Sequence, residues 1–85
     1  MLIELQLFAV ARQRAGRPRL TLELPDGSRV ADLRRVLAEF HPELAPLVPA
    51  LMIAVDAEYA DDDRLITPGA DLAAIPPVSG GWNRS

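Results

Sequence analysis

The sequence predicts an α+β fold: a mixed sheet with one main helix packed across it and an extended C-terminal tail. Apolar and polar residues alternate near the start of the chain, which is the period of a strand with one buried face. Between Val30 and Phe40 the apolar residues recur every three or four positions, the spacing of a helix. With 85 residues the chain is expected to form one domain, because so short a chain cannot divide its apolar surface between two cores.

Two N-terminal strands are expected, joined by a short helical turn. The first, residues 2–8, has an expected core face of Ile3, Leu5 and Leu7 and an opposite face of Glu4, Gln6 and Phe8. Residues 9–15 are expected to form a helical turn that Gly16 and Pro18 end. A second alternation in residues 20–24 predicts a strand antiparallel to the first.

The main helix is expected from Val30 to Phe40. Its expected apolar face consists of Val30, Leu33, Leu37 and Phe40, and its solvent side of Arg34, Arg35 and Glu39. Ser28 lies close to the start, where its hydroxyl is expected to accept a hydrogen bond from an unpaired amide, and the helix dipole favours Asp32 in the first turn. Pro42 ends the helix, because the residue before a proline is pushed out of the α region.

The remaining strands are expected at residues 51–55, in a hairpin at 56–59, and at 72–75. The apolar run 51–55 predicts a strand that is covered on both faces or central in its sheet. The right-handed crossover rule places the first and last strands side by side in parallel, and that arrangement is the β-grasp. Residues 1–75 are thus the expected domain and 76–81 an extended tail, and residues 82–85 continue beyond it.

The composition excludes several kinds of site. The chain has no cysteine and a single histidine, so a disulfide, a cysteine nucleophile and a cysteine or histidine zinc site are excluded, and no metal is expected. The net charge of −3 argues against nucleic acid. The aspartates at 61–63 lack the spacing of a calcium loop, which favours a solvated turn. The basic cluster Arg12, Arg14, Arg17 and Arg19 is more simply a solvated face than a dock for an acidic partner.

No membrane association is expected, because no segment approaches the roughly 20 apolar residues of a membrane span. Polar residues interrupt the N-terminal apolar run, so a secretory signal is not expected either, and the cytoplasm is the expected location.

The tail carries the strongest functional signal. Gly80 and Gly81 have no Cβ, so this backbone can enter a channel too narrow for any side chain. Pro76 and Pro77 stiffen the chain before the glycines and hold them away from the domain. A rigid spacer with a bare tip suits delivery of a C-terminal carboxylate into the active site of another protein.

Residues 75–81, Ile-Pro-Pro-Val-Ser-Gly-Gly, resemble the C-terminal signature of the MoaD-type sulfur carriers, the ubiquitin-like small subunits of molybdopterin synthase. Other segments that resemble this family are Leu7-Phe8-Ala9 with Arg12 and Gly16, Val30-Ala31-Asp32-Leu33, and Ile53-Ala54-Val55-Asp56 with Glu58-Tyr59. Pro68-Gly69-Ala70-Asp71 stands where the family usually has a more acidic turn. The resemblance covers residues 1–81.

This resemblance implies a sulfur-carrier function. A ubiquitin-activating-type adenylyltransferase would adenylate Gly81 with ATP, a sulfur donor would make the thiocarboxylate, and the large synthase subunit would pass the sulfur to a pterin precursor. Gly81 would be the attachment residue, and Gly80, which has no side chain, would let the tail enter a narrow channel in the partner. No cofactor is expected on this chain, and it is not expected to be an enzyme alone. A carrier for thiamin or cysteine synthesis, or an interaction module without sulfur transfer, is the alternative.

Residues 82–85, Trp-Asn-Arg-Ser, depart from the family, which normally ends at Gly-Gly. A glycine inside a peptide bond has no carboxylate to adenylate. Either a protease removes the four residues, or they do not belong to the natural chain, or sulfur transfer has been lost; the first two are favoured because the rest of the chain keeps the family pattern.

Apolar residues around the start of the tail are the expected partner surface. They are Phe8, Tyr59, Ile75, Pro76, Pro77 and Val78. The alternative for Phe8 and Ile75 is that they fill the core.

Overall fold

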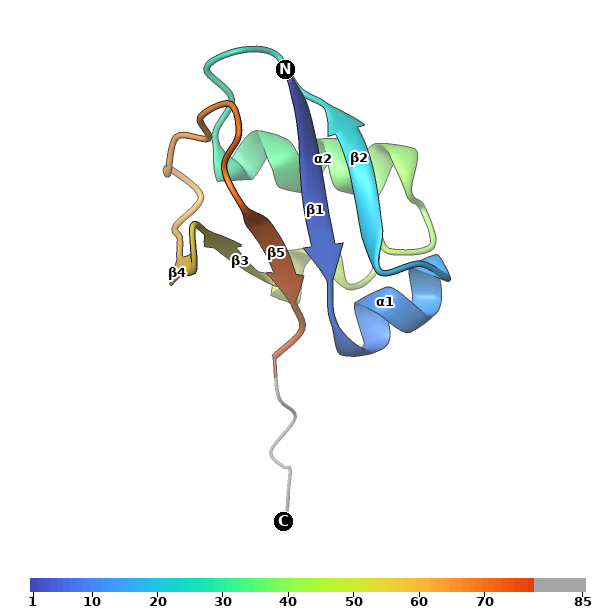
Figure 1. Cartoon of the computed structure of the whole chain (residues 1–85). Helices are drawn as coiled ribbons and strands as arrows, with labels where there is room; N and C mark the ends of the chain where they lie inside the picture. Colours follow the sequence, from blue (N-terminus) through green and yellow to red (C-terminus); the bar gives the residue numbers. More distant parts are fainter. Residues whose placement is uncertain (78–85) are drawn as a thin grey trace.

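Within residues 1–77, the part of the chain that the computed structural model describes, five strands form a single mixed sheet (Figure 1). The elements in chain order are β1 (Leu2–Leu7), α1 (Ala9–Ala15), β2 (Arg19–Glu23), α2 (Val30–Phe40), the 3-10 helix η1 (Val48–Ala50), β3 (Met52–Val55), β4 (Glu58–Tyr59) and β5 (Leu72–Ile75). The strand order is β2-β1-β5-β3-β4, and α2 crosses one face of the sheet.

The pairing of β1 with β5 is parallel, and every other pairing in this sheet is antiparallel. Leu5 lies opposite Leu72, and Leu7 lies opposite Ala74. The predicted β-grasp, with the first and last strands side by side, is therefore confirmed. The predicted bounds of domain, tail and extension stay predictions, because residues 78–85 lie outside the described part.

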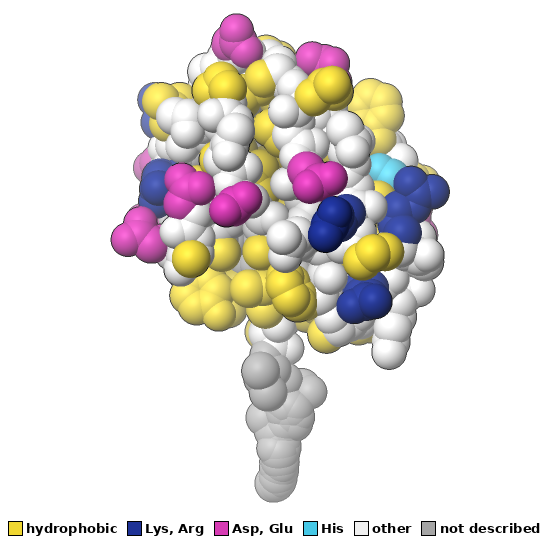
Figure 2. All heavy atoms as spheres, viewed as in Figure 1, with side chains coloured by type: hydrophobic (Ala, Val, Ile, Leu, Met, Phe, Trp, Pro, Cys, Tyr) yellow, Lys and Arg dark blue, Asp and Glu magenta, His cyan; other side chains and the backbone are white. Residues whose placement is uncertain are grey.

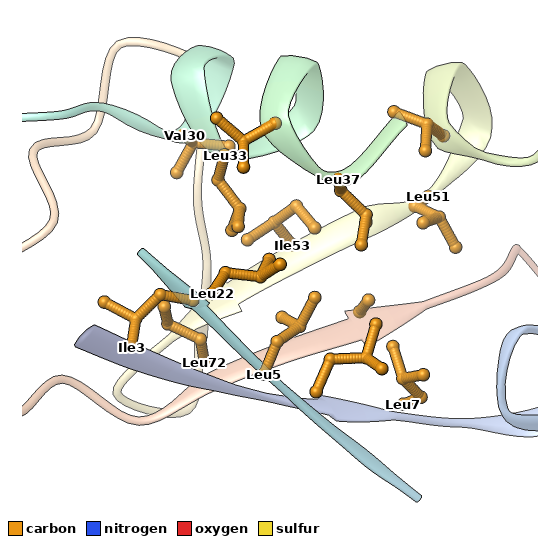
Figure 3. Packing of buried hydrophobic residues seen from close by; sticks show 14 of the residues in the cluster. Ile3, Leu5, Leu7, Leu22, Val30, Leu33, Leu37, Leu51, Ile53 and Leu72 are labelled. Carbon is orange, nitrogen blue, oxygen red and sulfur yellow. The ribbon is translucent and has the colours of Figure 1, made fainter. Parts of the chain in front are cut away.

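The core lies between the sheet and α2 (Figure 3). Val30, Leu33 and Leu37 of α2 are completely buried against the core face of the sheet, where β1 contributes its alternate residues. The core side chains of the three central strands are Ile3, Leu5, Leu7, Ile53, Val55, Leu72 and Ala74. Full burial of each leucine, isoleucine or valine stabilises the folded state by about 1.5–3 kcal/mol. The apolar residues that predicted the strands and the helix are therefore the ones that hold the two layers together.

Phe40 departs from the predicted apolar face, because 66% of it is exposed. Its angular position on α2 matches the buried residues, but the helix end lies beside β2, which is the edge strand. Val36 is buried on this face instead, and Leu44 of the following loop is also buried. The prediction for Phe40 was wrong because helical spacing does not show where the sheet ends.

Arg34 was predicted on the solvent side, and this was wrong. Its side chain is only 20% exposed, Nε donates to Oδ1 of Asp62 at 2.7 Å, and Nη1 donates to the carbonyl oxygen of Val48 at 2.8 Å. Arg34 thus joins α2 to the loop after β4 and to η1. A hydrogen bond from a charged group to a partly buried carbonyl oxygen contributes more to the free energy of unfolding than a surface ion pair does.

The first turn of α2 is not capped by Ser28, contrary to the prediction. The Ser28 hydroxyl donates to the carbonyl oxygen of Pro25 at 2.7 Å. The carbonyl oxygens of Asp62 and Arg64 accept the amide hydrogens of the first helical residues, each at 3.0 Å. The aspartate-rich loop therefore binds the start of α2 through its backbone.

No helix in residues 1–77 has both the length and the apolar composition that crossing a membrane requires. The cytoplasmic location stays a prediction.

Candidate functional site

The direction of the tail is determined by β5. This strand lies between β1 and β3 and ends at Ile75. The amide of Phe8 donates to the carbonyl oxygen of Ala74 at 3.3 Å, so β5 stays attached to β1 almost to its last residue. Pro76 is half-buried and Pro77 is exposed, and the chain leaves the domain here, at the end of the sheet beside α1.

An apolar surface surrounds this exit, on the sheet face opposite α2. We call Phe8, Met52, Tyr59 and Ile75 the tail-exit patch. Met52 lies opposite Ile75, while Phe8 follows the Leu7–Ala74 pair and so stands at the same level of the sheet. Tyr59 lies opposite Ala54, which is two residues further from the exit along β3 than Met52. Figure 2 shows apolar side chains gathered at this end of the molecule, around the base of the tail.

The patch residues differ in exposure. Tyr59 is 65% exposed, Phe8 is 44% exposed and Ile75 is half-buried. The alternative that Phe8 fills the core is therefore wrong, although binding of a partner by these residues stays a prediction. Exposed aromatic residues are enriched at protein interfaces.

Met52 belongs to the patch although the sequence did not single it out. For residues 51–55 the prediction was a strand either covered on both faces or central in its sheet, and β3 lies between β5 and β4. However, the run 51–55 is apolar at every position, so no alternation marks the residues that face outward. Met52 is 40% exposed, and its pairing with Ile75 identifies it as a patch residue.

A hollow of about 260 Å³ adjoins the patch on the same face of the sheet. It is lined by Gln6, Ala54, Ala57, Asp71, Leu72 and Ala73. Small side chains at positions 54 and 73, between Gln6 and Tyr59, leave the space. The hollow is large enough for a side chain of a docked protein, and the patch itself holds no carboxylate, imidazole or amine for acid–base chemistry.

The basic cluster lies away from the centre of the patch. Arg12 and Arg14 are exposed on α1, Arg17 is exposed in the loop that follows, and Arg19 is exposed at the start of β2. In Figure 2 the positive charge is concentrated on the β2 side of this face, and most of the negative charge lies elsewhere. Among residues 1–77, no group of three histidine or acidic side chains is placed to hold a metal ion, and the expectation of no metal stays a prediction.

The predicted attachment residues, Gly80 and Gly81, and the predicted contact residue Val78 lie outside the described part of the chain. Of the predicted contact residues, Phe8, Tyr59, Ile75, Pro76 and Pro77 lie at or near the end of the sheet where the tail begins, and the structure adds Met52 to them.

The chain is similar to known proteins over both the domain and the tail. The model of the ThiS family matches residues 5–81. The molybdopterin synthase sulfur carrier subunit of Arabidopsis thaliana is 37% identical over 79 residues, covering 93% of this chain and 82% of that protein. The protein of the same name from Caenorhabditis briggsae is 36% identical over 81 residues, covering 93% and 96%. Among solved structures, SAMP1 from Haloferax volcanii superposes with a TM-score of 0.82 at 26% identity, covering 95% of this chain and all of that one.

Proposed function

The chain belongs to the ThiS family, and from this premise we propose that it is the sulfur-carrier subunit of a molybdopterin synthase. The observation that carries the proposal is the match to residues 5–81, which ends on the second glycine of the pair. Curated relatives at 36–37% identity are named as this subunit and align over nearly their whole length or most of it.

The proposed cycle acts on the terminal carboxylate of Gly81. An activating adenylyltransferase joins that carboxylate to the AMP part of ATP and releases pyrophosphate. A donor of sulfide-level sulfur attacks the acyl carbon, AMP leaves, and a thiocarboxylate forms. The large subunit then transfers the sulfur to the pterin precursor, and an oxygen from water restores the carboxylate. ATP is used by the activating partner, so this chain binds no cofactor and is no enzyme by itself.

Removal of residues 82–85 is part of the proposal. While Trp82 follows in peptide linkage, Gly81 offers an amide in place of a carboxylate, and adenylation has no acceptor oxygen. A processing protease would expose the carboxylate. The prediction is that the chain ending at Gly81 is adenylated and the 85-residue chain is not.

The tail-exit patch is proposed to bind the large subunit. Gly81 follows Pro77 by four residues, which span at most about 14 Å when extended. The reacting carbon therefore reaches only an active site close to the exit, so the domain must dock beside its own tail. Phe8, Met52 and Tyr59 are the exposed apolar side chains of the patch that such docking would cover.

The test uses two purified forms, residues 1–81 and residues 1–85, with the activating partner, ATP and a sulfur donor. The shorter form is expected to release pyrophosphate and to exchange one oxygen for sulfur by intact mass, and the longer form to do neither. Release of pyrophosphate by neither form would favour an interaction module. Thiocarboxylate that forms but passes no sulfur to the pterin precursor on the large subunit would favour a carrier for thiamin or cysteine synthesis.

A further inference from the structure

The edge strand β2 presents an open set of backbone hydrogen-bonding groups. Leu24 donates to the carbonyl oxygen of Met1 at 2.9 Å, and Leu7 donates to that of Pro18 at 2.8 Å. Because hydrogen-bonded pairs alternate along an antiparallel ladder, the even-numbered residues of β2 bond to β1. The N–H and C=O groups of Arg19, Thr21 and Glu23 therefore point away from the sheet. In residues 1–77 no strand lies on that side of β2.

This edge lacks the features that usually prevent strand pairing. Residues 19–23 contain no proline or lysine, and their register with β1 is unbroken, so no bulge twists the edge away. The two charged side chains of the strand, Arg19 and Glu23, have opposite signs and lie at its two ends. A strand with this order of charges is complementary to itself when it is reversed.

We propose that β2 pairs with β2 of a second copy of this chain, antiparallel and about a two-fold axis at Thr21. In that register Thr21 lies opposite Thr21 of the second copy, and Arg19 lies opposite its Glu23, twice by symmetry. The three outward-facing residues would form about six backbone hydrogen bonds, because each such pair exchanges two. Opposite charges directly across a strand pair stabilise the pairing.

A groove beside β2 supports the same occupant. It has a volume of about 320 Å³ and is lined by Thr21, Leu22, Glu23, Val36, Phe40 and His41. The two-fold axis stands normal to the sheet, so both copies of α2 lie on the same side, and the two grooves meet over the new strand pair. The exposed ring of Phe40, which no residue in 1–77 covers, would be buried there.

The carboxylate of Glu23 is available for the second copy. It accepts a hydrogen bond from the Met1 amine at 3.2 Å, which raises the pKa of that amine. The Glu23 side chain is nevertheless 74% exposed, and its Oε1 is not the atom that makes this contact. An arginine across the strand pair can therefore bind it without displacing Met1.

Pairing through β2 leaves the tail-exit patch accessible. The strands β5, β3 and β4 lie on the other side of β1 from β2. Since β2 of the second copy runs antiparallel, β5 of the two copies point in opposite directions, and the two tails leave from opposite ends of a ten-stranded sheet. The inference goes beyond the proposed function, and the dimer forms whether or not sulfur is carried.

The first test is analytical ultracentrifugation of the full chain at concentrations up to about 1 mM. This high range is needed because pairing between two five-residue strands gives only weak association. The mass is expected to rise from 9.3 kDa toward twice that value. Thr21→Pro removes only an outward N–H, which an edge strand tolerates, and is expected to weaken the dimer at least tenfold. The matched control Thr21→Val keeps that N–H and is expected to stay within twofold.

The second test exchanges charges. Arg19→Glu and Glu23→Arg each place like charges across the axis and are expected to be monomeric alone, whereas a 1:1 mixture of the two variants is expected to dimerise again. Circular dichroism and thermal unfolding verify that each variant is folded. A monomeric wild-type chain throughout the range, a dimer that Thr21→Pro leaves intact, or a mixture that stays monomeric would each overturn the proposal.

Discussion

Replacing Tyr59 by alanine tests whether the tail-exit patch binds the large subunit. Full burial of an aromatic side chain contributes about 1.5–3 kcal/mol. Because 65% of Tyr59 is still exposed in the free domain, about 1–2 kcal/mol of that remains to be gained on docking. The dissociation constant for the large subunit is therefore expected to rise about 5- to 30-fold, measured by isothermal titration calorimetry with residues 1–81. Only a third of the residue is buried, so the domain should remain folded.

Phe40→Ala is the matched control. Phe40 is also aromatic and is 66% exposed, but it lies on α2 beside β2, away from the tail. At micromolar concentrations, where the chain is expected to be monomeric, this variant should bind the large subunit within twofold of the wild type. Equal affinities for Tyr59→Ala and the wild type, or an equal loss in both variants, would refute the assignment of the patch.

Three further variants test other parts of the account. Arg34→Ala is expected to lower the free energy of unfolding by about 1–3 kcal/mol, because it breaks the contacts to Asp62 and Val48. The control Arg35→Ala should lower it by less than about 1 kcal/mol, because Arg35 makes only a surface ion pair. Urea unfolding measures both, and equal losses would contradict the role of Arg34. Leu37→Ala should cost about 2–5 kcal/mol in the same assay, and a loss below 1 kcal/mol would count against the packing of α2. Gly81→Ala in the chain ending at residue 81 should leave unfolding unchanged and slow sulfur transfer, because its methyl group crowds the channel of the partner; an unchanged rate would argue against threading of the tail.

The sheet and the helix could be predicted because their patterns reflect burial directly. The alternation in residues 2–8 corresponds to burial of Ile3, Leu5 and Leu7 in the core. The parallel pairing of β1 with β5 follows from the handedness of the crossover and needs no side-chain information.

The errors lie where tertiary neighbours decide burial. Helical spacing placed Phe40 on the apolar face, but the ring lies beside the edge strand and stays exposed. An arginine on a helix is normally solvated, whereas Arg34 meets Asp62, which is distant in sequence. Met52 was hidden in a uniformly apolar run, and only its register with Ile75 shows that it faces outward. Of the tail-exit patch, the sequence therefore indicated Phe8, Tyr59 and Ile75 but did not indicate Met52.

The intact mass of the untagged protein from its native host, measured during molybdopterin synthesis, shows whether the chain carries sulfur at Gly81. We expect a species that ends at Gly81, in which one oxygen of the terminal carboxylate is replaced by sulfur. Detection of the 85-residue chain alone under these conditions would contradict sulfur carriage and leave the β-grasp fold without this function.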